Sequence, residues 1–409
     1  MPEPDDLLRR FRPQLRYDSQ EAFFADSAAE WTDNPGNELR RAYVDGRAGE
    51  LLAATDPKAG KAKLALDFLG HPAYADGTEA DKDDLISSPH REYRRRYAEL
   101  RQRPGYANHM YGRAQEDSDG RLWLAYWFYY FFNDYNLAGG LGLHEGDWEM
   151  VQLRIGPEGE RPDLAVYAQH RHAGRASWAD VEKDPANPDT ALVYVARGSH
   201  ASYFHAGYHE TEAWYDLADG KRTTPTLALN IIGAPVPGWL AWRGRWGDTQ
   251  PQIPGLHSPS PRGPLPHKQW ADPKRLLEDA VVATRSPALP PPEVRIERPG
   301  GRMLLHFDFS GRGKTRPERL VVTVNSASDK LPPRTYTFAL EPALRGSLQT
   351  DIELAQGKQY DIYVSTVDAD GRPSESVLVD PDGPGARPSW WQRPLRALAR
   401  LVARLRGTG

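Results

Sequence analysis

The sequence contains no cysteine, which excludes disulfide bonds, zinc–thiolate sites, iron–sulfur clusters and a cysteine nucleophile. It also lacks a run of the roughly 20 apolar residues that a membrane-spanning helix needs. The longest apolar run, residues 122–132, is short and aromatic and is expected to form a buried strand. The N-terminus has no basic start followed by an apolar stretch, so no signal peptide is expected. These absences predict a cytoplasmic protein, either free or peripheral on a membrane.

An excess of charge of one sign is absent as well. The 409 residues carry 52 basic and 56 acidic side chains, for a formal net charge of −4. This near balance gives no reason to expect nucleic acid or an acidic polymer as a partner. Hydrophobic residues make up 39% of the chain, which is enough for folded cores, and the length predicts two or three domains.

Two proline- and glycine-rich stretches divide the chain by composition. We expect a large β-sandwich domain with a few surface helices over residues 1–285, a proline-rich linker at 286–292 and a second β-sandwich over 293–380. A further linker at 381–388 precedes a short amphipathic helix over 389–406. The predicted fold class is therefore mainly β.

Strand patterns dominate both predicted domains. In the first domain, they cover residues 122–132, 148–155, 164–170 and 191–197. Weaker helical patterns cover 89–101 and 272–284, and the proline- and glycine-rich segment 233–270 is expected to be mostly irregular. In the second domain, six short alternating segments predict strands at 294–296, 303–309, 320–324, 335–340, 350–354 and 360–367.

The hexapeptide at 144–149, HEGDWE in one-letter code, is the strongest functional pattern. Residues two apart on a strand point to the same face, so Asp147 and Glu149 present parallel carboxylates that need a cation, a proton or a basic partner. His144 can reach the same point across a turn at Gly146, and Asp134 can add an oxygen. We therefore predict a divalent-cation site for Ca²⁺, Mg²⁺, Mn²⁺ or Zn²⁺, formed by His144, Asp147, Glu149 and Asp134. The alternative is that the acids are solvated strand-end residues without a ligand.

Further side chains are expected to surround the ion or its ligand. His170 and His200 each end a predicted strand, and their turns meet at one edge of the sheet if those strands are neighbours. Alternatively, each histidine makes only structural hydrogen bonds. Glu145, Tyr126 and Trp148 complete the predicted surroundings, with Trp148 on the opposite strand face as a core or support residue.

The last predicted element is a basic amphipathic helix. Its apolar residues form one stripe, and its arginines lie largely off that stripe. A short basic helix that begins with tryptophan has the composition of an in-plane anchor on an anionic membrane surface. The residues predicted to contact the membrane are Trp390, Trp391, Arg393, Arg396, Arg400 and Arg404. The alternative is that the stripe packs on the protein's own surface or on a second copy.

Several motifs, in order along the chain, resemble the vacuolar protein sorting-associated protein sixty-two family of bacterial type. They are residues 15–21, the aromatic segment 123–130, the motif 146–149, and the segments 167–170, 193–201 and 242–247. The resemblance covers most of residues 12–275. It implies a fold more than an activity, because that family has little assigned biochemistry.

The hexapeptide also resembles the Gly-His-Arg-His-Asp-Trp-Glu motif of the necrosis-inducing NLP cytolysins. Those are β-sandwich toxins that bind a divalent cation and sphingolipid headgroups at plant membranes. His144, Asp147 and Glu149 match cation-site positions of that motif, whereas Gly146 replaces its second His and Leu143 its leading Gly. An upstream Asp ligand has only an approximate counterpart in Asp134. These departures, with the missing signal peptide and cysteines, argue against a secreted plant toxin but are compatible with a shared cation-site geometry.

Residues 354–371 resemble part of a fibronectin type III domain, in which Tyr360 is the tyrosine corner. The tryptophan usual in the second strand of that family is replaced here by Phe307 or Phe309.

Three functions fit these patterns. The leading one is a non-enzymatic, divalent-cation-assisted binding protein that acts at a membrane surface or on lipid or glycan headgroups, such as those of a glycolipid or polysaccharide. In the second, a metal-dependent hydrolase, the same ion activates water, with Glu145 or His170 as base and His200 stabilising the developing charge. The third is a structural or trafficking module without a metal. The sequence contains no catalytic signature such as His-Glu-x-x-His, which argues mildly against the hydrolase.

Overall fold

The structure is a computed structural model. It describes residues 2–42, 49–56, 60–70, 72–88, 92–135, 142–170, 172–210, 215–248, 260–278, 280–282, 289, 292–309, 316–326, 334–340, 345–355, 358, 360–369, 374, 377–379 and 381. The chain divides into two compact units, one of residues 1–206 and 217–283 and the other of residues 207–216 and 284–409. Strands predominate in both units, which confirms the predicted mainly β fold class.

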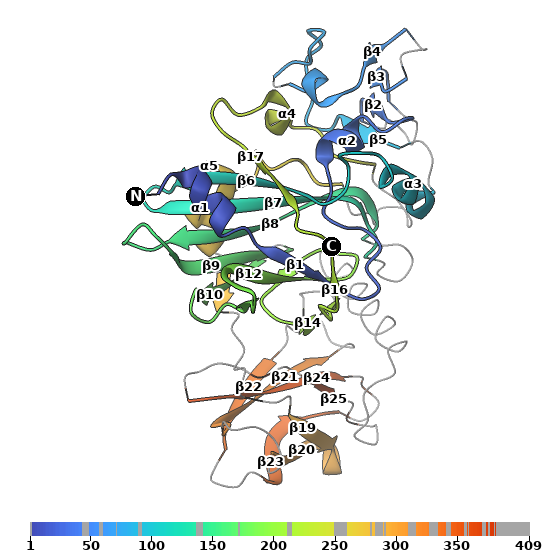
Figure 1. Ribbon diagram of the computed structural model, residues 1–409. Helices are drawn as coiled ribbons and strands as arrows, with labels where there is room; N and C mark the ends of the chain where they lie inside the picture. Colours follow the sequence, from blue (N-terminus) through green and yellow to red (C-terminus); the bar gives the residue numbers. More distant parts are fainter. Residues whose placement is uncertain are drawn as a thin grey trace. The chain divides into compact units, whose positions relative to one another are not determined.

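A seven-stranded sheet organises the first unit (Figure 1). Its strands, in spatial order, are β17 (Ala228–Ile231), β6 (His109–Glu116), β7 (Leu122–Asn133), β8 (His144–Ile155), β9 (Pro162–Gln169), β10 (His172–Ser177) and β18 (Ala280–Val282). Eleven of the twelve residues of β7 are buried, so the aromatic run forms the predicted strand buried on both faces.

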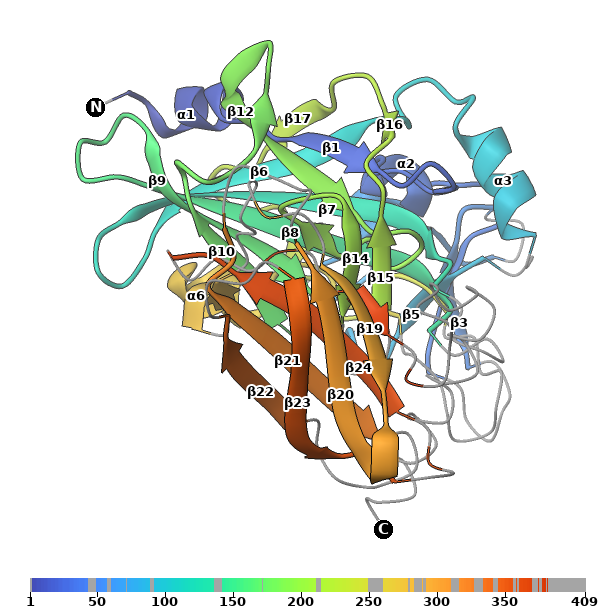
Figure 2. The same cartoon turned by 90° about the horizontal axis from the view of Figure 1, so that it is seen from below.

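A second sheet covers one face of this seven-stranded sheet (Figures 1 and 2). Its strands are β11 (Lys183–Asp184), β12 (Asn187–Val195), β1 (Gln14–Tyr17) and β16 (Arg222–Thr223), and β13 (Ser202–Tyr203) pairs with β12. Tyr126 lies between the two sheets and donates its hydroxyl hydrogen bond to the Leu8 carbonyl at 3.0 Å. The predicted sandwich is thus present, with its core filled by aromatic and branched side chains.

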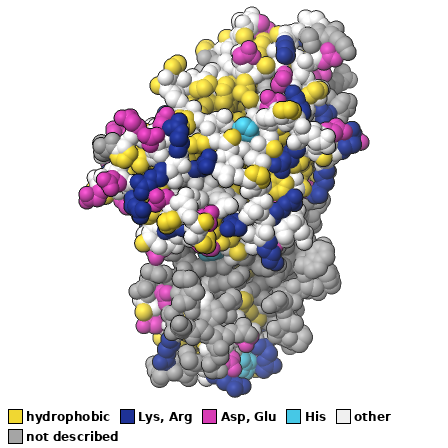
Figure 3. All heavy atoms as spheres, in the orientation of Figure 1, with side chains coloured by type: hydrophobic (Ala, Val, Ile, Leu, Met, Phe, Trp, Pro, Cys, Tyr) yellow, Lys and Arg dark blue, Asp and Glu magenta, His cyan; other side chains and the backbone are white. Residues whose placement is uncertain are grey.

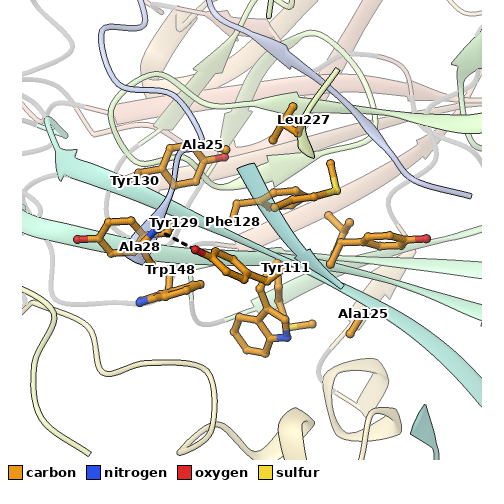
Figure 4. Packing of buried hydrophobic residues seen from close by; sticks show 14 of the residues in the cluster. Ala25, Ala28, Tyr111, Ala125, Phe128, Tyr129, Tyr130, Trp148 and Leu227 are labelled. Carbon is orange, nitrogen blue, oxygen red and sulfur yellow. Dashed lines mark hydrogen bonds between the residues drawn. The ribbon is translucent and has the colours of Figure 1, made fainter. Parts of the chain in front are cut away.

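Irregular chain and short helices cover the other face. These helices are α4 (Gly238–Ala241), α5 (Lys268–Ala271) and α6 (Lys274–Glu278). Figure 4 shows Tyr130 and Trp148 on opposite faces of the sheet, as the alternation of side chains along paired strands requires. The helix predicted over 272–284 is wrong beyond Glu278, because the β-branched residues Val281 and Val282 join the sheet as β18.

Smaller elements complete the first unit. A four-stranded sheet has the order β4 (Ala62–Lys63), β3 (Leu51–Ala54), β2 (Glu38–Arg40) and β5 (Leu85–Ser87). The helices are α1 (Pro4–Arg10), α2 (Ala28–Thr32), the short 3₁₀ helix η2 (Leu66–Phe68) and α3 (Tyr93–Leu100). The helix predicted over 89–101 therefore corresponds to α3. A separate two-stranded pair consists of β14 (Gly207–Glu210) and β15 (Tyr215–Ala218).

The second unit contains two antiparallel sheets. One has the order β19 (Glu293–Glu297), β20 (Arg302–Asp308) and β23 (Arg345–Glu353), with the short 3₁₀ helix η3 (Pro299–Gly301) before β20. The other has the order β22 (Arg334–Ala339), β21 (Arg319–Ser326), β24 (Tyr360–Val367) and β25 (Val377–Val379). Six of these strands match the predicted segments, and β25 was not predicted. The Tyr360 hydroxyl accepts a hydrogen bond from the Ala355 backbone N–H at 3.0 Å, the contact expected of a tyrosine corner.

Several predictions concern residues outside those that the structure describes. The helix over 389–406 and its six membrane-contact residues lie wholly outside, and the linkers 286–292 and 381–388 lie largely outside. Among the described residues, no helix is both long and apolar enough to cross a membrane.

Replacing Tyr360 by Phe should lower the free energy of unfolding of the second unit by about 1 kcal/mol, because the Ala355 N–H loses its acceptor. Hydrogen exchange of β23 and β24 in the full chain measures this change. Tyr336→Phe is the matched control, since the half-buried Tyr336 hydroxyl makes no hydrogen bond to the described residues. Equal exchange in the two variants would show that the corner contact adds no stability.

Candidate functional site

The hexapeptide forms the beginning of β8, paired with the end of β7. Asp147 lies opposite Tyr130 and Glu149 opposite Phe128, so the two acids share one face as predicted. The turn predicted at Gly146 is wrong, because Gly146 lies inside the strand with a φ of +61°. A side chain there would be strained, and its Cβ would lie 1.9 Å from the Trp246 carbonyl oxygen.

Asp147 is bound by a buried histidine from another part of the chain. His200 Nδ1 donates to Asp147 Oδ2 at 2.9 Å, and His200 Nε2 lies 3.7 Å from Glu21 Oε1, a distance for an ion pair rather than a hydrogen bond. The His200 ring also stacks on Tyr130, with centroids 3.9 Å apart and an angle of 1° between the planes. His200, Asp147 and Glu21 are 0%, 6% and 2% exposed, so the three charges compensate one another away from water.

Backbone groups hold Glu21 in place. Its Oε1 accepts hydrogen bonds from the N–H groups of Ala22 and Phe23 at 2.7 and 2.9 Å, and its Oε2 accepts one from Gly198 at 2.7 Å. Gly198 and His200 both have positive φ, at +76° and +56°, in the tight turn after β12. This turn directs the His200 side chain into the sheet interior while the Gly198 amide contacts Glu21.

The buried groups shift one another's proton affinity. Burial alone lowers the pKa of His200, but hydrogen bonding and charge from Asp147 and Glu21 outweigh it and raise that pKa to about 9. Burial alone raises the pKa of Glu21, but His200 and the backbone N–H groups outweigh it and lower that pKa. At neutral pH, His200 is therefore an imidazolium between two carboxylates.

Replacing His200 by Asn should lower the free energy of unfolding by about 3 kcal/mol at pH 7, because Asp147 and Glu21 lose their buried counter-charge. Asn tolerates positive φ, so the turn is preserved. A raised histidine pKa stabilises the fold fully below pH 6.5, and this contribution is lost as the pH rises through about 9. The difference between wild type and variant, measured by urea unfolding, should therefore shrink between pH 7 and pH 10.

The matched control is His109→Asn. His109 is half-buried on β6, contacts Asn230 at 3.1 Å and lies outside the site. A loss in the His200 variant no larger than in this control, or one that does not change with pH, would contradict the charged triad.

The His144 ring is oriented for a ligand on its free nitrogen. His144 Nδ1 donates to the Gly146 carbonyl at 2.8 Å, and its Nε2 makes no hydrogen bond to the described residues. Metal-binding histidines are commonly held in this way. Asp147 uses only Oδ2 for His200 and for Asn133 Nδ2 at 3.3 Å, and its Oδ1 accepts no hydrogen bond from the described residues. His144 and Asp147 thus each present one donor atom that suits a divalent cation.

Asp134, the fourth predicted ligand, follows β7 and forms an ion pair with Arg94 of α3. Arg94 Nη2 lies 2.6 Å from Asp134 Oδ2. Among the described residues, no group of three or more His, Asp or Glu side chains is arranged to hold a metal ion. The types of donor atom therefore fit a divalent cation. The described residues do not form a complete set of metal ligands, so the metal site stays a prediction.

A pocket of about 380 Å³ opens beside these acids. Its lining residues are Gln20, Glu21, Ala22, Arg94, Asp134, Arg197 and Gly198. Glu21 is connected to Asp147 through His200, and Asp134 follows Asn133, which binds Asp147 directly. The contacts of His200 and Asn133 therefore link Asp147 of the hexapeptide to two residues that line the pocket.

Glu145 makes its contacts away from Asp147. Its Oε2 accepts hydrogen bonds from the N–H groups of Ser88 and Asp248 at 3.1 and 3.0 Å, and its carbonyl accepts one from Ser260 Oγ at 2.7 Å. Burial raises the pKa of Glu145 to about 8. Glu145 thus connects the start of β8 to the backbone at Ser88 and Asp248.

Two predicted surrounding residues belong to the core, and one is exposed. Tyr126 is fully buried between the sheets. Trp148 packs among the rings of Tyr111, Tyr129, Trp239 and Trp246, as a core residue on the opposite face. His170 ends β9, is exposed and lies 5.7 Å from the Tyr135 ring. Of the predicted surrounding residues, His200 contacts an acid of the hexapeptide directly, through its hydrogen bond to Asp147.

Sequence reasoning missed Glu21, Arg94 and Arg197 as members of the site. Glu21 stands in the segment 15–21, whose pattern was noted only as a family resemblance. The two arginines carry no local signal that separates them from the other arginines of the chain, since their place in the pocket comes from tertiary folding.

No family model and no curated protein matches the chain. Among solved structures, it is similar to the crystal structure of Necrosis and Ethylene inducing Protein 2 from the causal agent of cocoa's Witches Broom disease, at 12% identity, with 58% of this chain and 76% of that chain covered and a TM-score of 0.28. It is also similar to a myokine structure, at 18% identity, with 23% of this chain and 95% of that chain covered and a TM-score of 0.18. Likenesses this weak say nothing about ligands, and the family resemblances of the sequence stay predictions.

Proposed function

We propose that this chain is a non-enzymatic binding protein that holds a lipid or glycan headgroup in the pocket at this end of the sheet, assisted by a divalent cation. The ion would be bound by His144, Asp147, Glu149 and Asp134, and ligand oxygens would complete its coordination. This proposal carries forward the resemblance to the NLP cytolysins and the vacuolar sorting sixty-two family.

The observation that carries the proposal is the open pocket beside buried acids. A pocket of about 380 Å³ is within the size range of small-molecule sites, and its lining includes both carboxylates and guanidinium groups. Such mixed charge suits a polar ligand more than an apolar one. Carboxylate oxygens are the donors that Ca²⁺, Mg²⁺ and Mn²⁺ prefer, and the free Nε2 of His144 favours Mn²⁺ or Zn²⁺ as well.

The geometry gives less support to a metal-dependent hydrolase. Of the bases considered, Glu145 uses Oε2 for two backbone N–H groups, and His170 is exposed at the end of β9. His200, considered as a stabiliser of developing charge, is fully buried against Asp147 and Glu21. A general base must reach the proton that it removes, and Glu145 is instead engaged by backbone groups away from Asp147.

The cation is tested by metal analysis and melting. After chelator treatment, Ca²⁺ or Mn²⁺ at 100 times its dissociation constant should stabilise the wild-type chain by about 2.7 kcal/mol. Asp147→Asn with Glu149→Gln should abolish metal uptake and this stabilisation. Glu149→Gln alone keeps the Asp147–His200 pair, so it should weaken uptake in a chain that still folds.

The control is Glu116→Gln with Asp119→Asn, which removes two exposed negative charges of the first unit outside the site. If mass spectrometry finds the same metal content in the control and in both site variants, the cation site is wrong and the metal-free structural or trafficking module is favoured. Turnover on a panel of esters, phosphates and glycosides by the metal-loaded chain would favour the hydrolase instead.

The ligand class is tested with vesicles and glycans in the presence of the bound ion. On the face shown in Figure 3, basic and acidic side chains of the first unit are interspersed, so this face offers no uniformly basic surface for an anionic membrane. Binding should therefore depend on the headgroup and on the cation rather than on the charge of the membrane alone.

A further inference from the structure

Three acids of the site are held by a cation of the chain itself. His200 holds Asp147 and Glu21, and Arg94 holds Asp134. The two arrangements differ in exposure. The side chains of His200 and Asp147 are 0% and 8% exposed, whereas those of Arg94 and Asp134 are 71% and 30% exposed. The exposed pair is therefore the one that a ligand can separate.

We propose that Arg94 is an internal competitor of the divalent cation, and that ligand binding exchanges the partners of the Arg94–Asp134 pair. The incoming cation takes the Asp134 carboxylate. The released guanidinium of Arg94 takes an anionic group of the ligand, a carboxylate or a phosphate. This inference rests on the proposed cation site and explains why its acids do not form a ready-made ligand set.

The pocket supports the anionic half of this exchange. Arg94 and Arg197 both line it. The hydrogen-bond partner of Arg197 among the described residues is the neutral amide of Gln20, at 2.5 Å from Nη1 to Oε1, rather than a carboxylate. Two guanidinium groups at one pocket provide several N–H donors for the oxygens of a carboxylate or phosphate.

An exposed ion pair is weak enough to be exchanged. Such pairs contribute little in water because both charges are well solvated. Arg94 therefore lowers the affinity of Asp134 for a cation without blocking it. A ligand that carries both charges, a divalent cation bound to an anionic headgroup, replaces both halves of the pair, so cation and anion should bind with positive coupling.

The first test compares Arg94→Gln with Arg95→Gln in the full chain. Arg95 lies on the same helix, is 57% exposed and pairs with Glu92 and Glu99 outside the pocket, so its loss changes the net charge equally. Calorimetric titration with Mn²⁺ at low ionic strength should show about twofold to fivefold tighter binding for Arg94→Gln than for Arg95→Gln. This difference should shrink in high salt, because an exposed charge is screened.

A double-mutant cycle shows whether Arg94 acts through Asp134. In an Asp134→Asn background, Mn²⁺ should bind more weakly, and Arg94→Gln should no longer tighten binding. Circular dichroism confirms that each variant is folded. Exposed substitutions of this kind usually change stability little, so all four chains should be measurable.

The second test adds the anion. Methyl phosphate in solution, and vesicles of phosphatidylcholine with phosphatidic acid, should each tighten Mn²⁺ binding to wild type more than to Arg94→Gln. Coupling with both probes means that the phosphate group suffices, and coupling with vesicles alone means that the source is a lipid surface; both support the exchange. Equal effects on wild type and Arg94→Gln would overturn its anionic half.

The outcomes separate this inference from the proposed function. If Mn²⁺ binds wild type but Arg94→Gln binds it no tighter than Arg95→Gln, the competitor is wrong and the cation site stands. Binding by Arg94→Gln alone would support the competitor most directly. If neither wild type nor any variant binds Mn²⁺, the proposed cation site is wrong and the competitor is overturned with it.

Discussion

A protonated imidazole enclosed by two carboxylates is the interaction on which this end of the first unit depends. Moving an ion from water into a protein interior costs several kcal/mol, so each buried charge must meet its partner in good geometry. His200 meets Asp147 at 2.9 Å and Glu21 at 3.7 Å, and Tyr130 covers its ring. This requirement brings together three separate parts of the chain. They are Glu21 in the segment after β1, Asp147 near the start of β8 and His200 in the turn after β12.

The same constraint explains the unusual backbone of the site. His200 adopts a positive φ, which is uncommon for a residue other than glycine, and Glu21 accepts three backbone hydrogen bonds. At Gly146, positive φ and the close approach of the Trp246 carbonyl both exclude a side chain. Glu145 accepts hydrogen bonds from the backbone N–H groups of Ser88 and Asp248. Asp147, by contrast, binds His200. The hexapeptide thus combines a structural residue, Glu145, with Asp147, which is linked through His200 to Glu21 at the pocket.

Buried and exposed charges give the site two kinds of acid. Asp147 pairs with the buried His200 inside the fold, whereas Asp134 pairs with the exposed Arg94 at the surface. In the proposed exchange, a ligand that enters the pocket would meet Arg94 and Asp134 already paired with each other. The proposal therefore predicts selectivity for a ligand that carries both a cation and an anionic group, because both partners must be replaced at once.

Local patterns in the sequence were enough to predict the mainly β class, the buried strand that became β7, and six strands of the second unit, because strand periodicity and turn residues are local properties. The shared face of Asp147 and Glu149 and the core position of Trp148 followed from the same periodicity. Only the tertiary structure decided which charges compensate which. Glu21 and Asp147 are 126 positions apart and meet only through His200, and Arg94 reaches Asp134 from a separate helix. Ion pairing depends on distance in space, which no local pattern of residues contains.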